Sequence, residues 1–198
     1  MYVIRVREAV KWIKASPSRS RSFKEIAKIA KVDTSKFLCM DVPTRWNSTY
    51  LMLEAALPYE PAMRLFQTLN PDFASDLKER KHKKMSIGVP TELDWIEVKR
   101  MCGFLEQFYN LTHLVSGSHY VTSHQVLMEL CDMISLVTDL EEDEDDGLRN
   151  MAMRMRLKIG KYWLEETELN PKMNKILYIA AMLDPRPKMK HVEHFGVR

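Results

Sequence analysis

The chain has 198 residues, enough for one domain with a sizeable core or one domain with a small appendage. Hydrophobic residues make up 45% and charged residues 29%, and no apolar run reaches the roughly 18 residues that a membrane-spanning helix requires. The first residues contain no continuous apolar stretch of the signal-peptide type. We therefore expect an intracellular protein that has no membrane partner.

The cysteine, histidine and glycine content argues against several classes of site. Cys39, Cys102 and Cys131 are widely spaced and odd in number, as expected for free thiols in a reducing compartment. No Cys/His group has zinc-ligand spacing, and His191 with His194 supplies only two ligands. Six glycines are too few to favour a β-rich fold or a Gly-loop enzyme. We expect no metal and no cofactor.

Hydrophobic periodicity predicts a series of helices in the first half of the chain. Apolar residues recur every three or four positions over residues 2–15 and again over residues 22–31, with a Ser/Pro break between them. Residues 36–42 form a short apolar run, either a strand or a buried extended segment. A long helix opens near Thr44 and is interrupted by prolines before residue 69. Residues 70–90 are polar and are predicted to form a linker.

The second half continues the helical pattern. Thr91, followed by Glu92 and Asp94, resembles a helix N-cap with acids in the first turn. Further helices are expected from Ser123, after an acidic loop over residues 139–146, and from Pro171 to Asp184. The predicted fold class is mainly α, a helical bundle with at most one or two short strands near residues 36–42.

The predicted organisation has three parts within one continuous domain. A basic helical segment covers residues 1–69, the polar linker residues 70–90, and a second helical region residues 91–198. Residues 1–36 contain ten lysines and arginines and three acids, a net charge of +7, whereas the whole chain has +3. This asymmetry suits a phosphate-facing surface. It equally suits two amphipathic helices with ordinary basic outer faces.

No catalytic motif is present. The sequence contains no Gly-rich phosphate loop, no Gly-x-Ser-x-Gly and no His-Glu-x-x-His. Metal-dependent strand transfer requires two or three carboxylates that converge on divalent ions. Asp41 stands alone beside an apolar run, and we expect it to cap the helix that opens at Thr44. We predict no catalytic residue in this chain.

Residues 38–53, LCMDVPTRWNSTYLML, closely resemble the stretch of hAT-family DNA transposases that surrounds an Arg-Trp pair. The resemblance is greatest to the plant sleeper type, the zinc-finger BED domain-containing proteins. Other segments resemble the family in the family's order and extend the match over nearly the whole chain. They are residues 4–8, 16–19, 94–95, 104–109, 112–118, 120–123, 161–163 and 183–186.

The resemblance implies a position and a function for the motif. In this family an RNase H-like catalytic core is split by a large helical insertion, and the Arg-Trp motif of that insertion approaches the active site. Its tryptophan stacks on a base displaced during DNA hairpin formation; here it is Trp46, with Arg45 holding a phosphate. The alternative is that Trp46 anchors the core of its own helix. The predicted DNA-binding residues are Arg45, Trp46, Asn47, Arg5, Lys11, Lys14 and Arg19.

The resemblance also bears on enzyme status. The family's two catalytic aspartates correspond to positions before this chain, and its glutamate to a position far beyond Asp184–Arg186. Pro187 departs from the small or apolar residue usual there. We therefore expect a non-catalytic, DNA-binding fragment of a transposase or domesticated transposase, located in the nucleus. It would have no small-molecule substrate, and homo-oligomers would occur only in full-length relatives. The alternative is a helical protein-interaction module without DNA affinity.

Overall fold

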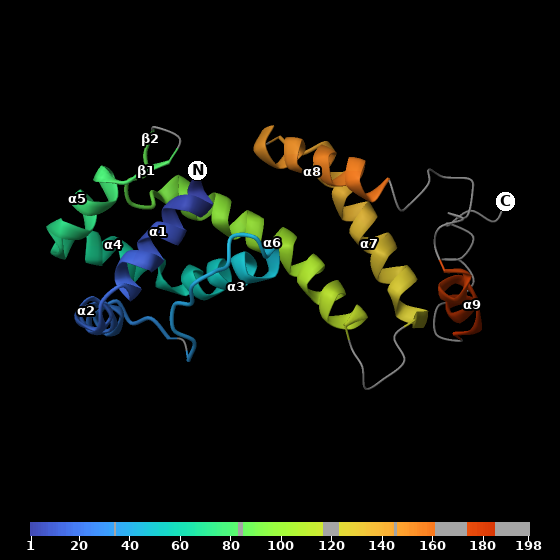
Figure 1. The fold of residues 1–198 in the computed structure, drawn as a ribbon, viewed down its shortest axis with the longest axis horizontal. Helices are drawn as coiled ribbons and strands as arrows, with labels where there is room; N and C mark the ends of the chain where they lie inside the picture. The colour runs from blue at the N-terminus through green and yellow to red at the C-terminus, as the bar shows by residue number, and fades with distance from the viewer. Residues whose placement is uncertain (34, 83–84, 117–122, 145, 161–173, 185–198) are drawn as a thin grey trace. The chain divides into compact units, whose positions relative to one another are not determined.

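The protein is mainly α-helical, as predicted (Figure 1). The computed structural model describes residues 1–33, 35–82, 85–116, 123–144, 146–160 and 174–184. The chain divides into two compact units, Met1–Glu106 and Gln107–Arg198. No helix in the described ranges is long and apolar enough to cross a membrane.

The first unit is built from short helices around α1. Its elements are α1 (Tyr2–Lys14), α2 (Pro17–Ile29), α3 (Trp46–Ala56), the 3-10 turn η1 (Leu57–Tyr59), α4 (Glu60–Leu69), α5 (Pro71–Glu79), β1 (Lys81–His82), β2 (Met85–Ser86) and the first part of α6 (Glu92–Val115). α1 packs against α2, α3 and α5, α2 packs against α4, and α4 packs against α5. α1 therefore lies at the centre of the unit.

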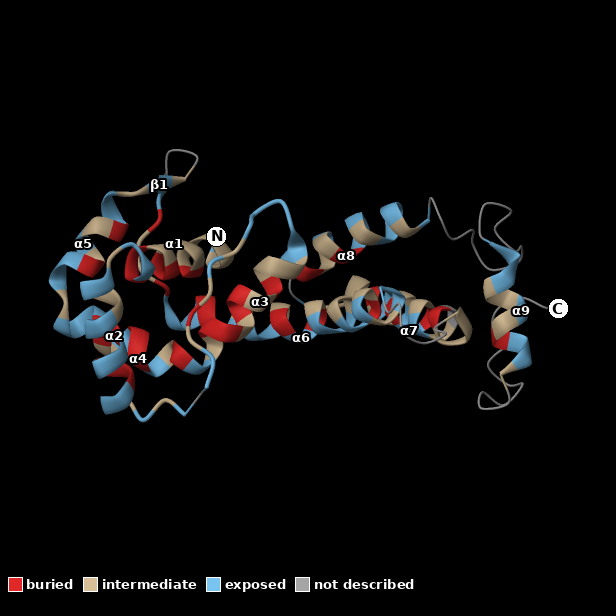
Figure 2. Cartoon of the chain, turned by 60° about the horizontal axis from the view of Figure 1, so that its bottom comes forward, coloured by how far each residue is buried: buried red, intermediate tan, exposed pale blue. Residues whose placement is uncertain are grey.

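Aromatic side chains from four helices form the core of this unit. Trp12, Phe23, Phe66 and Phe73 are at most 1% exposed, and their rings meet edge to face at centroid distances of 5.2–6.0 Å. Buried residues line the inner faces of α1, α3 and α4 in Figure 2. Each ring buries a large apolar area, so this cluster supplies much of the unit's hydrophobic stabilisation.

Two helix boundaries differ from those predicted. α2 begins at Pro17 rather than near residue 22, because Ser16 is extended and proline fits the first turn of a helix. α3 begins at Trp46 rather than near Thr44. It gives way to η1 and α4 where Pro58 and Pro61 interrupt the pattern, as expected. Thr91 caps α6: its Oγ1 accepts from Asp94 N at 3.3 Å, while Thr91 N donates to Asp94 Oδ2 at 2.7 Å.

Residues 70–90 contain a helix and a hairpin where the sequence analysis predicted a polar linker. Asn70 caps α5 by accepting from Phe73 N at 3.2 Å, and Phe73 and Leu77 are fully buried. Two apolar residues four positions apart give a short helix a core-facing side, even among many charges. The strands lie here, where β1 pairs antiparallel with β2, rather than at residues 36–42.

The second unit contains α7 (Ser123–Glu141), α8 (Asp146–Ile159), α9 (Lys175–Leu183) and the end of α6. α7 packs against both α8 and α9. The acidic loop is shorter than predicted, because α7 continues to Glu141. The Glu141 carboxylate forms an ion pair with Arg156 of α8 at 3.5 Å. The predicted features at residues 117–122, 161–173 and 185–198 lie outside the described residues.

Candidate nucleic-acid interface

An extended segment, residues 36–45, leads into the Arg-Trp motif. Hydrogen bonds with side chains connect this segment to three helical elements. Lys14 Nζ of α1 donates to Leu38 O at 2.9 Å, and Tyr59 Oη of η1 donates to Lys36 O at 3.0 Å. Cys39 Sγ contacts Leu51 O of α3 at 3.4 Å. Side chains thus hold the segment in place, and it pairs with no strand in the described part of the chain.

Asp41 is held by Arg7 and does not cap α3, contrary to the sequence-based expectation. Arg7 Nε donates to both carboxylate oxygens at 3.0 and 2.9 Å, and Arg7 Nη2 lies 2.7 Å from Oδ2. Thr49 Oγ1 donates to Oδ2 at 3.0 Å. The Asp41 side chain is 1% exposed. Burial alone would raise the pKa of Asp41, but the hydrogen bonds from Arg7 and Thr49 lower it below its usual value.

Ser48 holds the turn that immediately precedes α3. Its hydroxyl accepts from Val42 N at 2.8 Å and lies 2.9 and 2.8 Å from the carbonyl oxygens of Val42 and Arg45. Arg45 N donates to Val42 O at 2.8 Å, which closes the turn. Arg45 occupies the N-cap position of α3 in an extended conformation. The backbone of the motif is therefore fixed on the first turn of the helix.

The side chains of Arg45 and Trp46 are exposed, whereas that of Asn47 is partly buried. Trp46 is 42% exposed, whereas Trp12 is 1% exposed in the core. Arg45 is exposed, and its guanidinium forms no ion pair with any residue that the structure describes. Asn47 is half-buried, and its Oδ1 is shielded from solvent without a hydrogen-bond partner among the described residues. The turn thus presents an indole and a cation on a rigid support.

Arg5, one of the predicted DNA-binding residues, joins α1 to the start of α6. Its Nη1 lies 2.7 and 3.1 Å from the two oxygens of Asp94, and its Nε donates to Ile87 O at 2.8 Å. Burial would raise the pKa of Asp94, but hydrogen bonds from Thr91 and Arg5 lower it. The structure therefore places Arg5 in a tertiary ion pair.

Three more predicted residues on α1 and α2 also have partners within the protein. Lys11 pairs with Glu8 at 2.8 Å. Arg19 stacks on the Trp12 ring at 3.8 Å, and its guanidinium lies 3.5 Å from Asp76. Lys14 is exposed and donates to Leu38 O, as described above. Of the seven predicted residues, Arg45, Trp46 and Lys14 are exposed, and only Arg45 and Trp46 lie on the turn itself.

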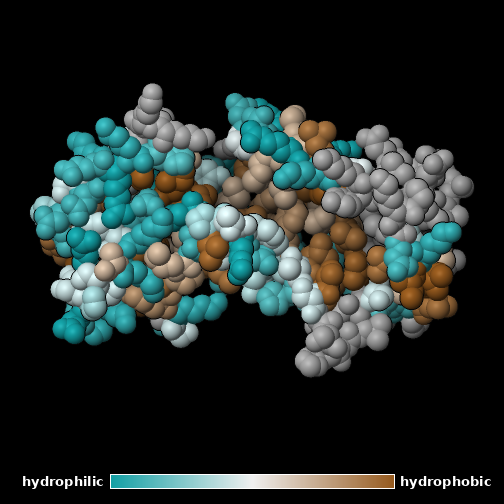
Figure 3. All heavy atoms as spheres, in the orientation of Figure 1, coloured by the Kyte–Doolittle hydropathy of each residue, from teal (hydrophilic) through white to brown (hydrophobic). Residues whose placement is uncertain are grey.

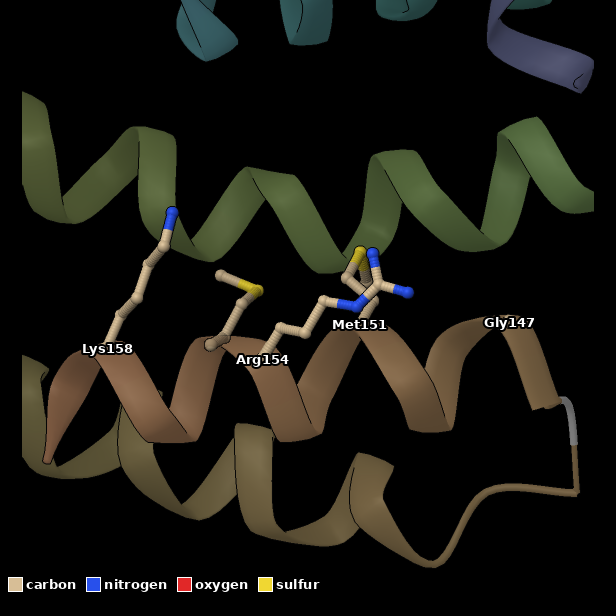
Figure 4. A pocket seen from close by; sticks show the side chains of 5 residues that line it. Gly147, Met151, Arg154 and Lys158 are labelled. Carbon is tan, nitrogen blue, oxygen red and sulfur yellow. The ribbon is translucent and has the colours of Figure 1, made fainter.

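A pocket in the second unit offers no alternative catalytic centre. It is lined by one side of α8, with Gly147, Met151, Arg154, Met155 and Lys158 (Figure 4). This lining is apolar and cationic and contains no acidic or nucleophilic side chain. Among the described residues, no group of three His, Cys, Asp or Glu side chains could hold a metal ion.

Comparison with known proteins gives two family matches. Residues 1–104 match the ZBED1 RNase-like helical domain, and residues 124–196 match the hAT-like transposase, RNase-H fold. The first match covers the whole of the interface described above. No solved structure shows a significant match.

Curated relatives from three plants are similar over most of this chain. The zinc finger BED domain-containing protein RICESLEEPER 2 of Oryza sativa subsp. japonica is 33% identical over 96% of the chain and 24% of the relative. The putative AC transposase of Zea mays is 31% identical over 96% and 21%. DAYSLEEPER of Arabidopsis thaliana is 27% identical over 86% and 22%. The chain spans about a quarter of the length of these relatives. The chain belongs to the family of the ZBED1 RNase-like helical domain, which residues 1–104 match, and its residues 124–196 are similar to the hAT-like transposase, RNase-H fold.

Proposed function

We propose that this chain binds DNA through the Arg45–Trp46 turn, as a non-catalytic part of a transposase-derived protein. One observation carries the proposal: an exposed tryptophan beside an arginine without an ion-pair partner in the described structure, both on a hydrogen-bonded turn. An exposed aromatic ring beside a cation is the combination with which proteins bind unpaired bases and their phosphates. The names of the relatives, which include transposases, support DNA as the partner.

The two side chains supply complementary interactions. An indole stacks on an unpaired base with a free energy of about 1–3 kcal/mol. The arginine beside it binds a phosphate and positions the strand. Asn47 is half-buried and its Oδ1 is shielded from solvent, so it would contribute less than Arg45 and Trp46. Arg5, Lys11, Lys14 and Arg19 would contribute less, because their cationic groups already have partners.

The non-catalytic part of the proposal rests on Asp41. Its carboxylate is buried against Arg7 and Thr49, so a metal ion could bind it only by displacing the guanidinium. Purified protein with magnesium or manganese should therefore neither nick nor join transposon-end DNA. Cleavage that disappears in Asp41→Asn would contradict this assignment. With this DNA-binding role we propose a nuclear location.

A helical protein-interaction module is the second candidate. It is favoured by α9, whose Ile176, Ile179, Met182 and Leu183 are 54–76% exposed. Apolar side chains at this spacing form one face of a helix, and such faces commonly contact other proteins. On this alternative the chain has no affinity for DNA.

A DNA titration separates the two functions. Fluorescence anisotropy would compare a plain duplex with a duplex carrying one unpaired base, at several salt concentrations. Trp46→Ala should weaken binding to the unpaired-base duplex by about 5- to 100-fold, with an unchanged salt slope. Arg45→Gln should lower the slope by about 0.9 for both duplexes. Leu93→Ala, an exposed apolar control on α6, should have no effect. Absence of salt-sensitive binding by the unmodified chain would favour the interaction module.

A further inference from the structure

The outer edge of α2 carries a row of basic residues that are not among the seven predicted DNA-binding residues. Arg21, Lys24, Lys28 and Lys31 recur every three or four positions and are all exposed. They therefore share one side of the helix and its C-terminal extension. The opposite side of α2 contributes Phe23, Ile26 and Ala27 to the core. Packing thus orients the row toward solvent; the surface over α2, at the lower left of Figure 1, is mostly teal and white in Figure 3.

Most of this charge is not neutralised within the protein. Lys28 pairs with Glu25 at 2.9 Å, but Arg21, Lys24 and Lys31 have no ion pair with the part of the chain that the structure describes. This contrasts with α1, where Arg5, Arg7 and Lys11 are all paired. The only acids on α2 and in the three residues after Ala30 are Glu25 and Asp33. Lys14 is the one cation of α1 without an ion pair in the described structure, so most of the unpaired positive charge of residues 1–36 lies on α2 and in the residues just after it.

The basic row adjoins the segment that leads to the motif. The ammonium groups of Lys24 and Lys14 lie 4.6 and 5.5 Å from the centroid of the same Phe37 ring. The eight Cα–Cα steps from Phe37 to Arg45 span at most about 29 Å when the chain is fully extended. That is less than one turn of B-DNA, about 34 Å. One duplex can therefore contact both the row and the turn.

Lys31 occupies a backbone conformation that favours glycine. Its φ is +53°, and it ends α2 in a double hydrogen-bonded cap, with Lys31 N donating to Lys28 O and Val32 N donating to Ala27 O, both at 3.0 Å. A side chain at this position strains the backbone, whereas glycine would not. A lysine here costs stability and adds a cation at the end of the row. Strain of this kind is typical of functional positions.

We infer that Arg21, Lys24 and Lys31 form a second DNA-contacting surface, which binds the phosphate backbone and supplies most of the salt-dependent affinity. The inference rests on the proposed DNA-binding function and identifies the residues that provide its electrostatic part. A row of cations about 15 Å long matches a line of regularly spaced phosphates. It carries no base-reading group, so its contribution is independent of DNA sequence.

The test compares two triple variants of the full chain that have the same net charge. One is Arg21→Gln/Lys24→Gln/Lys31→Gln; the control is Lys78→Gln/Lys99→Gln/Arg154→Gln, three exposed cations on other helices. The probe is a 20-base-pair duplex of arbitrary sequence, titrated from 50 to 300 mM salt. The α2 variant should lower the salt slope by two to three and weaken binding at 0.1 M salt at least tenfold, while the control slope stays within 0.5 of the original.

A single substitution gives a second readout. Lys31→Gly should raise the melting temperature by about 2–4 °C, because it relieves the strained backbone, and yet lower the salt slope by about 0.9. Substitution of a residue with only a structural role would change the melting temperature and leave the salt slope of DNA binding unchanged.

Three outcomes would overturn the inference, and they can be told apart. Equal slopes for the α2 variant and its control would refute this surface while leaving DNA binding by the Arg45–Trp46 turn intact. No salt-sensitive DNA binding by the unmodified chain would refute the proposed function as well. Binding of a poly-glutamate peptide as tightly as the duplex would identify the surface as an acidic-protein site instead.

Discussion

Arg7 and Asp41, 34 residues apart in sequence, form a two-oxygen ion pair in which the Asp41 side chain is 1% exposed. Arg7 lies on the central helix α1, and Asp41 precedes the Arg45–Trp46 turn by four residues. The pair attaches the motif to the core of its unit. A loop held in this way loses little conformational entropy when it binds a ligand.

Removal of the Asp41 charge should destabilise the fold in a pH-dependent manner. Asp41→Asn should lower the free energy of unfolding at pH 7 by about 3 kcal/mol, because Arg7 loses its partner. The folded-state pKa of Asp41 lies below its unfolded value, so the pair contributes fully above about pH 4. That contribution is lost as the pH falls through the folded-state pKa.

Urea denaturation followed by circular dichroism at pH 7 and pH 3 would test this. The difference between the unmodified chain and Asp41→Asn should shrink at the lower pH. Thr49→Val, which removes one hydrogen bond to the same carboxylate, should cost only about 1 kcal/mol. If the difference in stability between the two proteins did not depend on pH, the charge of Asp41 would not be its source.

Substitution of Trp46 and of Trp12 compares the contribution of an exposed tryptophan to stability with that of a core tryptophan. Trp12→Ala should destabilise the protein by about 3–5 kcal/mol, since it empties a core position and removes the hydrogen bond from Nε1 to Asp76 Oδ2, 2.7 Å long. Trp46→Ala should change stability by less than about 1 kcal/mol, because its side chain is 42% exposed. Thermal denaturation of both variants measures the contrast. Unfolding of Trp46→Ala would instead assign Trp46 to the core and remove the stacking role.

Arg5→Gln distinguishes a tertiary ion pair from a DNA contact. The substitution leaves Asp94, a buried carboxylate, without its guanidinium, so the free energy of unfolding should fall by about 2 kcal/mol. The salt slope of DNA binding should change less than in Arg45→Gln. A fall in slope of about 0.9 at unchanged stability would make Arg5 a phosphate contact after all.

The buried cysteines should resist alkylation in the folded protein. Burial raises the pKa of Cys102 and of Cys131 to about 12, and both residues are 6% exposed. Because only the thiolate reacts, each should label about 10³-fold more slowly at pH 8 than a cysteine of ordinary pKa. Iodoacetamide labelling followed by mass spectrometry would measure the rates, with urea-unfolded protein as the control. Rapid labelling of either residue in the native state would show that its helix opens readily.

The helices could be predicted largely from the sequence because their signals are local. The 3.6-residue stripe of α6, its Thr91 cap and its end at Val115 all follow from residues close together in the chain. α5 was missed because its charged residues outnumber Phe73 and Leu77. Its stability comes from the core that those two side chains enter. The strands near residues 81–86 are too short to leave a pattern.

The motif around Trp46 was recognisable from the sequence, and so was the positive charge of residues 1–36. Which side chains remain available to a partner was decided only by the tertiary structure. Arg7 meets Asp41 across 34 residues and Arg5 meets Asp94 across 89, whereas Arg45, on its turn, meets no acid in the described structure. Helical periodicity determines the face on which a residue lies. The neighbours of that face depend on packing between distant segments, and those neighbours determine whether a cation is paired or open to solvent.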